Sequence, residues 1–220
     1  DYNTTDMSEN RMFNEYLLPY KMAVEAGVGS VMTSFNDING TPATANKWIM
    51  DDVLRKQWHF DGFLVTDYGA IREMEAHGLG DDATVTERAM NATVDMDMCS
   101  ELYISQLTEL VKAGKITEKQ IDDACRRVLQ AKYRLGLFDD PYKYINKEKG
   151  AKELFKPENR EAARRITAST FVLLKNDNNL LPLQKKGKIA LIGPVANSKS
   201  QLTGCWSVSS DYSKYSTIYE

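Results

Sequence analysis

The carboxylate at residue 67 is the side chain of this sequence that is best placed to do chemistry. Asp67 follows the apolar run Gly62–Thr66, which predicts a short buried strand. Parallel α/β folds gather their reactive groups at the carboxyl ends of strands, so Asp67 is a candidate nucleophile or proton carrier. Its alternative role is that of a helix N-cap, because Asp is a favoured capping residue where a strand leads into a helix.

Two further carboxylates, Asp37 and Asp97, lie near the ends of strands predicted at 30–35 and 94–98 and could share the same edge. Asp37 stands in an Asn-Asp-Ile-Asn-Gly turn, where an Asx-type turn is the expected role. For Asp97, set between two methionines, we expect a buried carboxylate that accepts hydrogen bonds from the backbone. His77 is expected at a helix C-terminus, where the helix dipole stabilises its charged form.

Composition excludes several classes of function. The chain of 220 residues has 28 basic and 31 acidic side chains, well mixed along the sequence, and a formal charge of −3. No basic stretch suits a nucleic-acid backbone, and no apolar run approaches the roughly 20 residues of a membrane-spanning helix. Three cysteines without paired spacing and two histidines predict neither a disulfide framework nor a metal site.

The elements that must position Asp67 alternate between helices and strands. Such an order requires a parallel sheet that is covered by helices. The helix that begins near Ser8 should bend at Pro19, and two later helices carry capping boxes, Thr84 with Glu87 and Thr117 with Gln120. The predicted elements are helices over 8–27, from Asn46, from Thr84, over 102–113 and from Thr117 to about Gly136, and strands over 30–35, 62–66 and 94–98.

The last third of the chain predicts a second α/β unit. The composition of 139–157 is typical of a surface connector. A helix over 158–175 and an apolar strand over 188–194 follow it, and no second strong strand stands beside that one in the sequence.

Several segments carry distinctive motifs in one collinear order, and together they cover nearly the whole chain. They are Asp1–Ser8, Val31–Asn36, Asn39–Ala43, Asp51–Trp58, Gly62–Ile71, Asp122–Leu129, Lys132–Tyr133, Leu135–Phe138, Asp140–Tyr142, Ser169–Pro182 and Ile189–Pro194. This set resembles glycoside hydrolase family 3, in its bacterial β-glucosidase branch. The run Gly62–Ile71 resembles the nucleophile signature of that family.

The resemblance implies the later part of a (β/α)8-type TIM barrel at 1–140, a linker at 141–157 and the start of an α/β/α sandwich at 158–220. It implies an exo-acting, retaining β-glucosidase-like hydrolase, with β-xylosidase as the other substrate class, which acts on a β-linked oligosaccharide or glycoside and needs no cofactor. It implies that Asp67 is the nucleophile, that the acid/base residue lies outside these 220 residues, and that the protein is periplasmic or secreted.

Two aromatic residues are the expected substrate-binding partners of Asp67. The resemblance places Tyr68 at the border of the sugar site, while packing beneath its own loop is the alternative. Phe35 stands where some relatives have a Tyr that reaches the nucleophile, and it has no hydroxyl to donate. A non-catalytic carbohydrate-binding or pseudoenzyme module of the same fold is the other functional hypothesis. We expect the isolated segment to be inactive, because open barrel edges leave strands unpaired.

Overall fold

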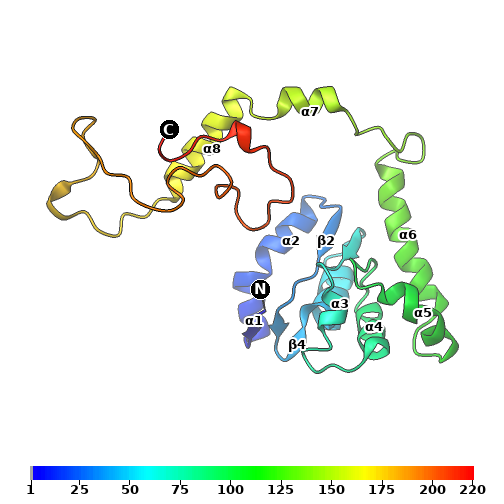
Figure 1. The fold of residues 1–220 in the computed structure, drawn as a ribbon. Helices are drawn as coiled ribbons and strands as arrows, with labels where there is room; N and C mark the ends of the chain where they lie inside the picture. The colour runs from blue at the N-terminus through cyan, green and yellow to red at the C-terminus, as the bar shows by residue number, and fades with distance from the viewer. Residues whose placement is uncertain (1) are drawn as a thin grey trace. The chain divides into compact units, whose positions relative to one another are not determined.

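The computed structural model describes residues 2–220 and divides the chain into two compact units, Asp1–Ala151 and Lys152–Glu220 (Figure 1). Short strands and helices alternate along the first unit, which has an α/β fold. The second unit contains helices and extended segments. No helix within residues 2–220 combines the length and the apolar character needed to cross a membrane.

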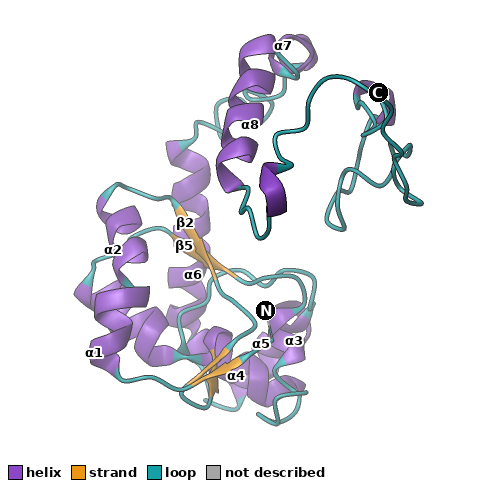
Figure 2. Cartoon of the chain, turned by 90° about the vertical axis from the view of Figure 1, so that its left-hand side faces the viewer, coloured by secondary structure: helices purple, strands orange, loops and turns teal. Residues whose placement is uncertain are grey.

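The centre of the first unit is a pair of parallel strands, β2 (Ser30–Met32) and β5 (Phe63–Val65), which lie side by side (Figure 2). On the other side of β5, Val65 forms a parallel bridge with Met96. The three predicted strands are therefore neighbours in chain order. The strand predicted over 94–98 is thus reduced to one bridging residue, Met96.

A second sheet, of three short strands, was not predicted from the sequence. Its strands are β1 (Thr4–Thr5), β3 (Asp37–Ile38) and β4 (Thr41–Pro42). β1 pairs in parallel with β3, which pairs antiparallel with β4. Asn39 and Gly40 connect β3 to β4 with positive φ angles of 52° and 77°, as a tight hairpin turn requires. Strands of two residues carry no periodicity that a sequence could reveal.

Most predicted helices of the first unit are present. Pro19 lies in the first turn of α2, at the bend that the sequence predicted. Two of the helical segments, η1 and η3, are π-helical, and η2 is a 3₁₀ turn. The helical elements are α1 (Glu9–Arg11), η1 (Met12–Tyr16), α2 (Leu18–Glu25), η2 (Ala43–Ala45), η3 (Trp48–Gln57), α3 (Ala70–Glu73), α4 (Asp82–Asn91), α5 (Leu102–Lys112) and α6 (Glu118–Arg134).

The capping predictions met different outcomes. The capping box of Thr117 and Gln120 is confirmed at the start of α6. The predicted box at Thr84 is wrong, because α4 begins two residues earlier, at Asp82, and Asp81 is its cap. The Asp81 carboxylate accepts a hydrogen bond from the backbone N–H of Thr84 at 2.9 Å, and a carboxylate is a stronger acceptor at a helix N-terminus than a hydroxyl.

Two hydrophobic clusters form much of the core of the first unit. Leu64, in the middle of β5, is fully buried and packs with Met50 and Leu54 of η3. Ile71 of α3 and Val85 of α4 are fully buried in a second cluster that joins α3, α4 and α5. Burial of such side chains is the main favourable term in folding.

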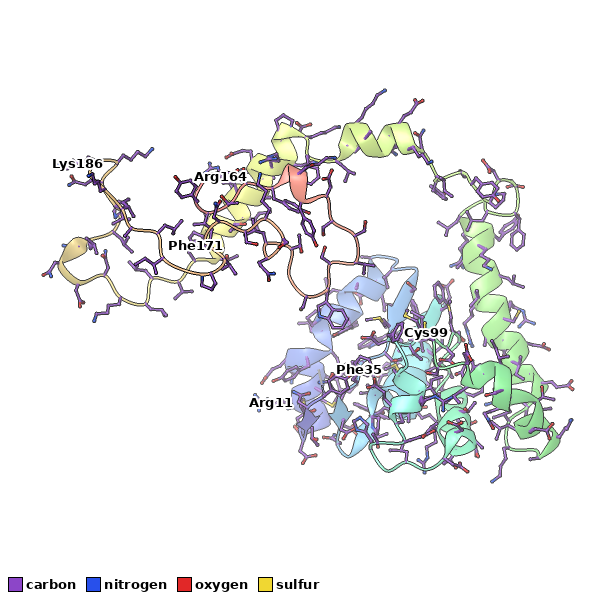
Figure 3. All side chains as sticks on the ribbon, in the orientation of Figure 1. Arg11, Phe35, Cys99, Arg164, Phe171 and Lys186 are labelled. Carbon is purple, nitrogen blue, oxygen red and sulfur yellow. The ribbon has the colours of Figure 1, made fainter. Side chains whose placement is uncertain are left out.

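The connector and the second unit differ from the prediction in detail. The predicted connector contains a helix, α7 (Lys147–Glu153), and the next helix, α8 (Pro157–Thr170), ends five residues before the predicted Lys175. Phe171, just after α8, has an extended backbone and lies on an extended segment (Figure 3). Two short 3₁₀ turns follow, η4 (Asp177–Asn179) and η5 (Tyr212–Lys214).

The strand predicted over 188–194 is wrong for this structure. Residues 188–194 form no strand, and the Ile192 side chain is 90% exposed. A strand needs a neighbour with which to exchange backbone hydrogen bonds, and no strand forms among residues 152–220. The apolar pattern alone therefore does not produce the predicted element.

Candidate active site

Asp67 lies two residues beyond the end of β5, at its carboxyl end. Its side chain is half-buried, and its Oδ1 accepts a hydrogen bond from the backbone N–H of Tyr68 at 2.6 Å. Within residues 2–220 this is the one hydrogen bond that the carboxylate accepts. The carboxylate is thus oriented by a backbone N–H and is still reachable from solvent.

The alternative role of Asp67 as a helix N-cap is wrong. The helix that follows, α3, begins at Ala70, and its N-cap position is Gly69, without a capping side chain. Gly69 has φ of 70°, a left-handed conformation that glycine adopts without strain. Asp67 contributes only its backbone carbonyl, which accepts from the N–H of Ala70 at 3.2 Å. Its carboxylate is thus free of the capping role.

Backbone hydrogen bonds connect the Asp67 loop to the neighbouring strand end. The N–H of Gly69 donates to the carbonyl of Met98 at 2.8 Å. The N–H of Met98 in turn donates to the hydroxyl of Thr66 at 2.9 Å, and the Thr66 side chain is fully buried. These bonds fix the backbone on both sides of Asp67.

The two aromatic residues named from the sequence have different environments. Tyr68 is 68% exposed, so it is not packed beneath its loop. Phe35 is half-buried in the loop after β2 (Figure 3), and its ring stacks on Tyr2 with the centroids 4.8 Å apart and the planes 20° from parallel. The Tyr2 hydroxyl donates to Oε1 of Glu73 at 3.3 Å. The contact between Tyr2 and Glu73 was not predicted, because the two residues are 71 positions apart along the chain.

The contacts of Tyr2 link the loop after β2 to α3. Its ring stacks on Phe35 and its hydroxyl donates to Glu73, and α3 begins three residues after Asp67. The hydrogen bond to Glu73 is the main factor that raises the pKa of the Tyr2 hydroxyl, and the negative charges of Glu73 and Asp67 act in the same direction.

The hydrogen bonding predicted for Asp97 is confirmed, although the residue is half-buried rather than buried. Its carboxylate accepts hydrogen bonds from the backbone N–H groups of Ser100 at 3.2 Å, Leu102 at 2.9 Å and Tyr103 at 3.3 Å. The carboxylate thereby satisfies donors at the start of α5 that have no partner within the helix. Asp97 is a structural residue of the same rim.

The predictions for Asp37 and His77 need correction. Asp37 belongs to β3, and the turn is made by the residues after it. Nδ1 of His77 lies 2.9 Å from Oδ1 of Asp37, although this oxygen accepts no hydrogen bond of ordinary geometry. His77 lies in the turn beyond α3, so its neighbour is the carboxylate of Asp37 in β3 rather than a helix terminus alone.

A buried ion-pair network lies near the start of β5, and the sequence did not predict it. The Asp95 side chain is fully buried and accepts hydrogen bonds from Arg55 at 2.5 Å and from Arg127 at 2.6 Å. It also accepts from the backbone N–H of Leu64, in β5, at 2.8 Å. Burial raises the pKa of the Asp95 carboxyl, and the positive charges of the two arginines oppose this effect.

Comparison with protein families assigns the chain. The model of the glycosyl hydrolase family 3 N-terminal domain matches residues 1–131, which is more than half of the 220 residues. The chain belongs to glycosyl hydrolase family 3. The model of the family 3 C-terminal domain matches residues 171–220, so the resemblance seen in the sequence is confirmed in both halves.

The chain is similar in sequence to a beta-glucosidase and to a beta-xylosidase. It is 44% identical over 211 residues to the periplasmic beta-glucosidase of Salmonella typhimurium, covering 94% of this chain and 28% of that protein. It is 37% identical over 227 residues to a beta-xylosidase of Formosa agariphila, covering 98% of this chain and 31% of that protein. The chain thus spans less than a third of the length of these relatives.

Solved structures agree with this assignment. The crystal structure of beta-glucosidase from Listeria innocua in complex with glucose matches 90% of this family 3 chain and 27% of that chain, with a TM-score of 0.79 and 42% identity. The likeness is consistent with the α/β fold of the first unit.

Proposed function

We propose that the full-length protein containing this chain is an exo-acting, retaining glycosidase of the β-glucosidase type, with Asp67 as its nucleophile. The position of Asp67 carries this proposal. Its carboxylate stands half-buried at the carboxyl end of a parallel strand, is oriented by the N–H of Tyr68, and takes no part in capping α3. Relatives named beta-glucosidase and beta-xylosidase support the same class of reaction.

The proposed mechanism uses two carboxyl groups. The ionised Asp67 attacks the anomeric carbon of the terminal β-D-glycosyl residue while a carboxylic acid protonates the departing oxygen. Water, deprotonated by the same acid/base group, then hydrolyses the covalent glycosyl-enzyme. The retaining course requires the two carboxyl groups to be about 5 to 5.5 Å apart. By resemblance to family 3, we propose that the acid/base group lies outside these 220 residues.

Phe35 and Tyr68 are proposed to line the sugar site beside Asp67. The exposed Tyr68 ring can pack against the apolar C–H face of a sugar. The substrate class is a β-linked oligosaccharide or glycoside released from its non-reducing end. A relative named as periplasmic supports a periplasmic or secreted location.

We propose that residues 1–140 are the later part of a (β/α)8-type barrel, that 141–157 link the domains, and that 158–220 begin an α/β/α sandwich. Two observations support this organisation. The strands β2 and β5 and the bridge at Met96 follow one another in parallel, as the successive strands of such a barrel do. The two family models also match separate parts of the chain.

Covalent labelling tests the proposed nucleophile. A slow 2-fluoro glycoside should trap the glycosyl-enzyme of the full-length protein, and mass spectrometry should find the sugar on the peptide that contains Asp67. Asp67→Ala should lower kcat by roughly a thousandfold or more, and added azide should restore turnover by attacking the anomeric carbon from the vacated side. Asp61→Ala, which removes an exposed partner of Arg134, is the matched control and should retain wild-type kcat.

Two results would defeat the assignment of Asp67. One is a label on a different carboxylate, and the other is full activity in Asp67→Ala. A non-catalytic carbohydrate-binding module would bind the glycoside and leave every carboxylate unlabelled. Intact-mass measurement of the protein after incubation separates that hypothesis from the proposed enzyme.

A further inference from the structure

Tyr2 connects the loop after β2 to α3, the helix that follows Asp67 in the chain. Its ring stacks on Phe35, in the loop after β2, with the centroids 4.8 Å apart. Its hydroxyl donates to Oε1 of Glu73, on α3, at 3.3 Å. Because α3 begins three residues after Asp67, a single side chain connects the helix behind the nucleophile to the aromatic residue expected in the sugar site.

We infer that Glu73 is a positioning residue, which acts through the Tyr2 hydroxyl to hold the stacked rings of Tyr2 and Phe35 as one wall of the sugar site beside Asp67. This inference rests on the proposed function. It adds two residues to the site, since neither Tyr2 nor Glu73 was expected from the sequence.

The geometry explains why the hydrogen bond is needed. Tyr2 is 62% exposed, so few neighbours restrain its ring apart from Phe35. Offset stacking sets the distance and the angle between two rings, but it leaves each ring free to slide and rotate in its plane. The bond to Glu73 removes that freedom. A wall that is ordered before the sugar arrives avoids the entropy cost of ordering it during binding.

The Tyr2 hydroxyl bonds to Glu73 and not to the candidate nucleophile. Its hydrogen bond to Oε1 of Glu73 restrains the ring, while Asp67 accepts its own hydrogen bond from the N–H of Tyr68. Glu73 is half-buried and acts through its bond to Tyr2. Loss of the bond between Tyr2 and Glu73 should therefore raise KM and leave kcat, which reports the chemical step at Asp67, nearly unchanged.

Steady-state kinetics of three variants of the full-length enzyme test the inference. Tyr2→Phe keeps the ring and removes the donor, and Glu73→Ala removes the acceptor. Each should raise KM for an aryl β-glycoside about fivefold, with kcat within twofold of wild type, because a hydrogen bond that aids binding alone has been lost. Glu73→Gln retains an amide oxygen that can accept from Tyr2, and should stay within twofold of wild type in KM.

The double variant Tyr2→Phe/Glu73→Ala distinguishes one shared interaction from two separate ones. If the residues act through the same hydrogen bond, its KM should equal that of either single variant. Tyr20→Phe, at an exposed position on α2, is the matched control and should match wild type. A thermal unfolding midpoint equal to that of wild type in each variant would show that the fold is kept.

The outcomes separate this inference from the proposed function. KM values within twofold of wild type in Tyr2→Phe and Glu73→Ala overturn the inference, as do effects that multiply in the double variant. Equal defects in Glu73→Gln and Glu73→Ala also overturn it, since the charge of Glu73 would then matter rather than its bond to Tyr2. In each case the 2-fluoro label on Asp67 persists. A wild-type enzyme that acquires no label overturns both proposals together.

Discussion

Removal of the buried Asp95 carboxylate should destabilise the first unit far more than removal of an exposed one. Asp95 is fully buried and holds Arg55, whose side chain is only 8% exposed. Arg55 also donates to the carbonyl of Gly62 at 2.6 Å. In Asp95→Ala the Arg55 charge stays in the interior without a counter-charge, while Arg127, 24% exposed, can turn toward water.

The expected loss of stability follows from the burial of the Asp95 and Arg55 side chains. Breaking a buried ion pair by removing one partner costs about 3 to 5 kcal/mol, because the other charge is left uncompensated. The unpaired N–H of Leu64 adds a cost of about 1 kcal/mol or more unless water enters the space. We therefore expect Asp95→Ala to lower the free energy of unfolding by about 4 kcal/mol.

A buried ion pair need not add net stability, because desolvation of the two charges opposes their attraction. Burial raises the pKa of Asp95 and lowers the pKa of Arg55. A carboxyl with a raised pKa in the folded state makes folding more favourable below its unfolded pKa, and this advantage is lost as pH rises through the folded pKa. The cost in the variant therefore arises from the orphaned partners, and not from a lost attraction.

Urea denaturation of the full-length protein measures the difference, and amide exchange of the β5 peptide reports opening at Leu64. The control is Asp61→Ala. Asp61 pairs with Arg134 at 2.6 Å, but both side chains are more than half exposed, so solvent screens the interaction and its loss should be a small fraction of the Asp95 effect. Equal losses in the two variants would refute the reasoning, because burial is the only large difference between the pairs.

Two further predictions concern backbone packing and a helix cap. Gly62→Ala should lower the free energy of unfolding by about 1 to 3 kcal/mol, because the added Cβ would lie 2.3 Å from the carbonyl oxygen of Gly29. Gly29→Ala is the control, since its Cβ would meet nothing within 4 Å. Equal urea midpoints in the two variants would contradict the steric argument. The hydroxyl and the N–H of Thr84 lower the pKa of Asp81, so the stability from this cap is present above the unfolded pKa of about 3.9 and is lost as pH falls through the folded pKa. Asp81→Asn keeps the acceptor without titrating, so the stability advantage of wild type over this variant should shrink on acidification from pH 7 to pH 3, and a constant difference would contradict the assignment.

Local signals in the sequence were sufficient for many elements of the first unit. The capping box at Thr117 correctly placed the start of α6, and the apolar run before Asp67 correctly placed β5. The helix predicted over 102–113 is α5, within one residue. Each of these signals lies within a few residues of the element it specifies, so no tertiary information is needed to read it.

Interactions between distant residues could not be predicted in the same way. Asp95 meets Arg55 and Arg127 across 40 and 32 residues, and Tyr2 meets Glu73 across 71. A single sequence contains many carboxylates and arginines and does not say which of them the fold brings together. The strand predicted over 188–194 failed for a related reason, because an apolar run specifies burial while a strand also requires a hydrogen-bonding neighbour.

The strand that carries Asp67 is fixed at its two ends by different chemistry. At its start, the Asp95 carboxylate accepts the N–H of Leu64, and Arg55 holds the carbonyl of Gly62. Beyond its end, the bonds of Thr66 and Gly69 to Met98 define the loop. Charged side chains thus contribute at the first end of the strand, whereas neutral hydrogen bonds define the loop at the end that carries Asp67. Since no cation pairs with the Asp67 carboxylate among the hydrogen bonds of residues 2–220, the proposed function leaves this carboxylate available to attack an anomeric carbon.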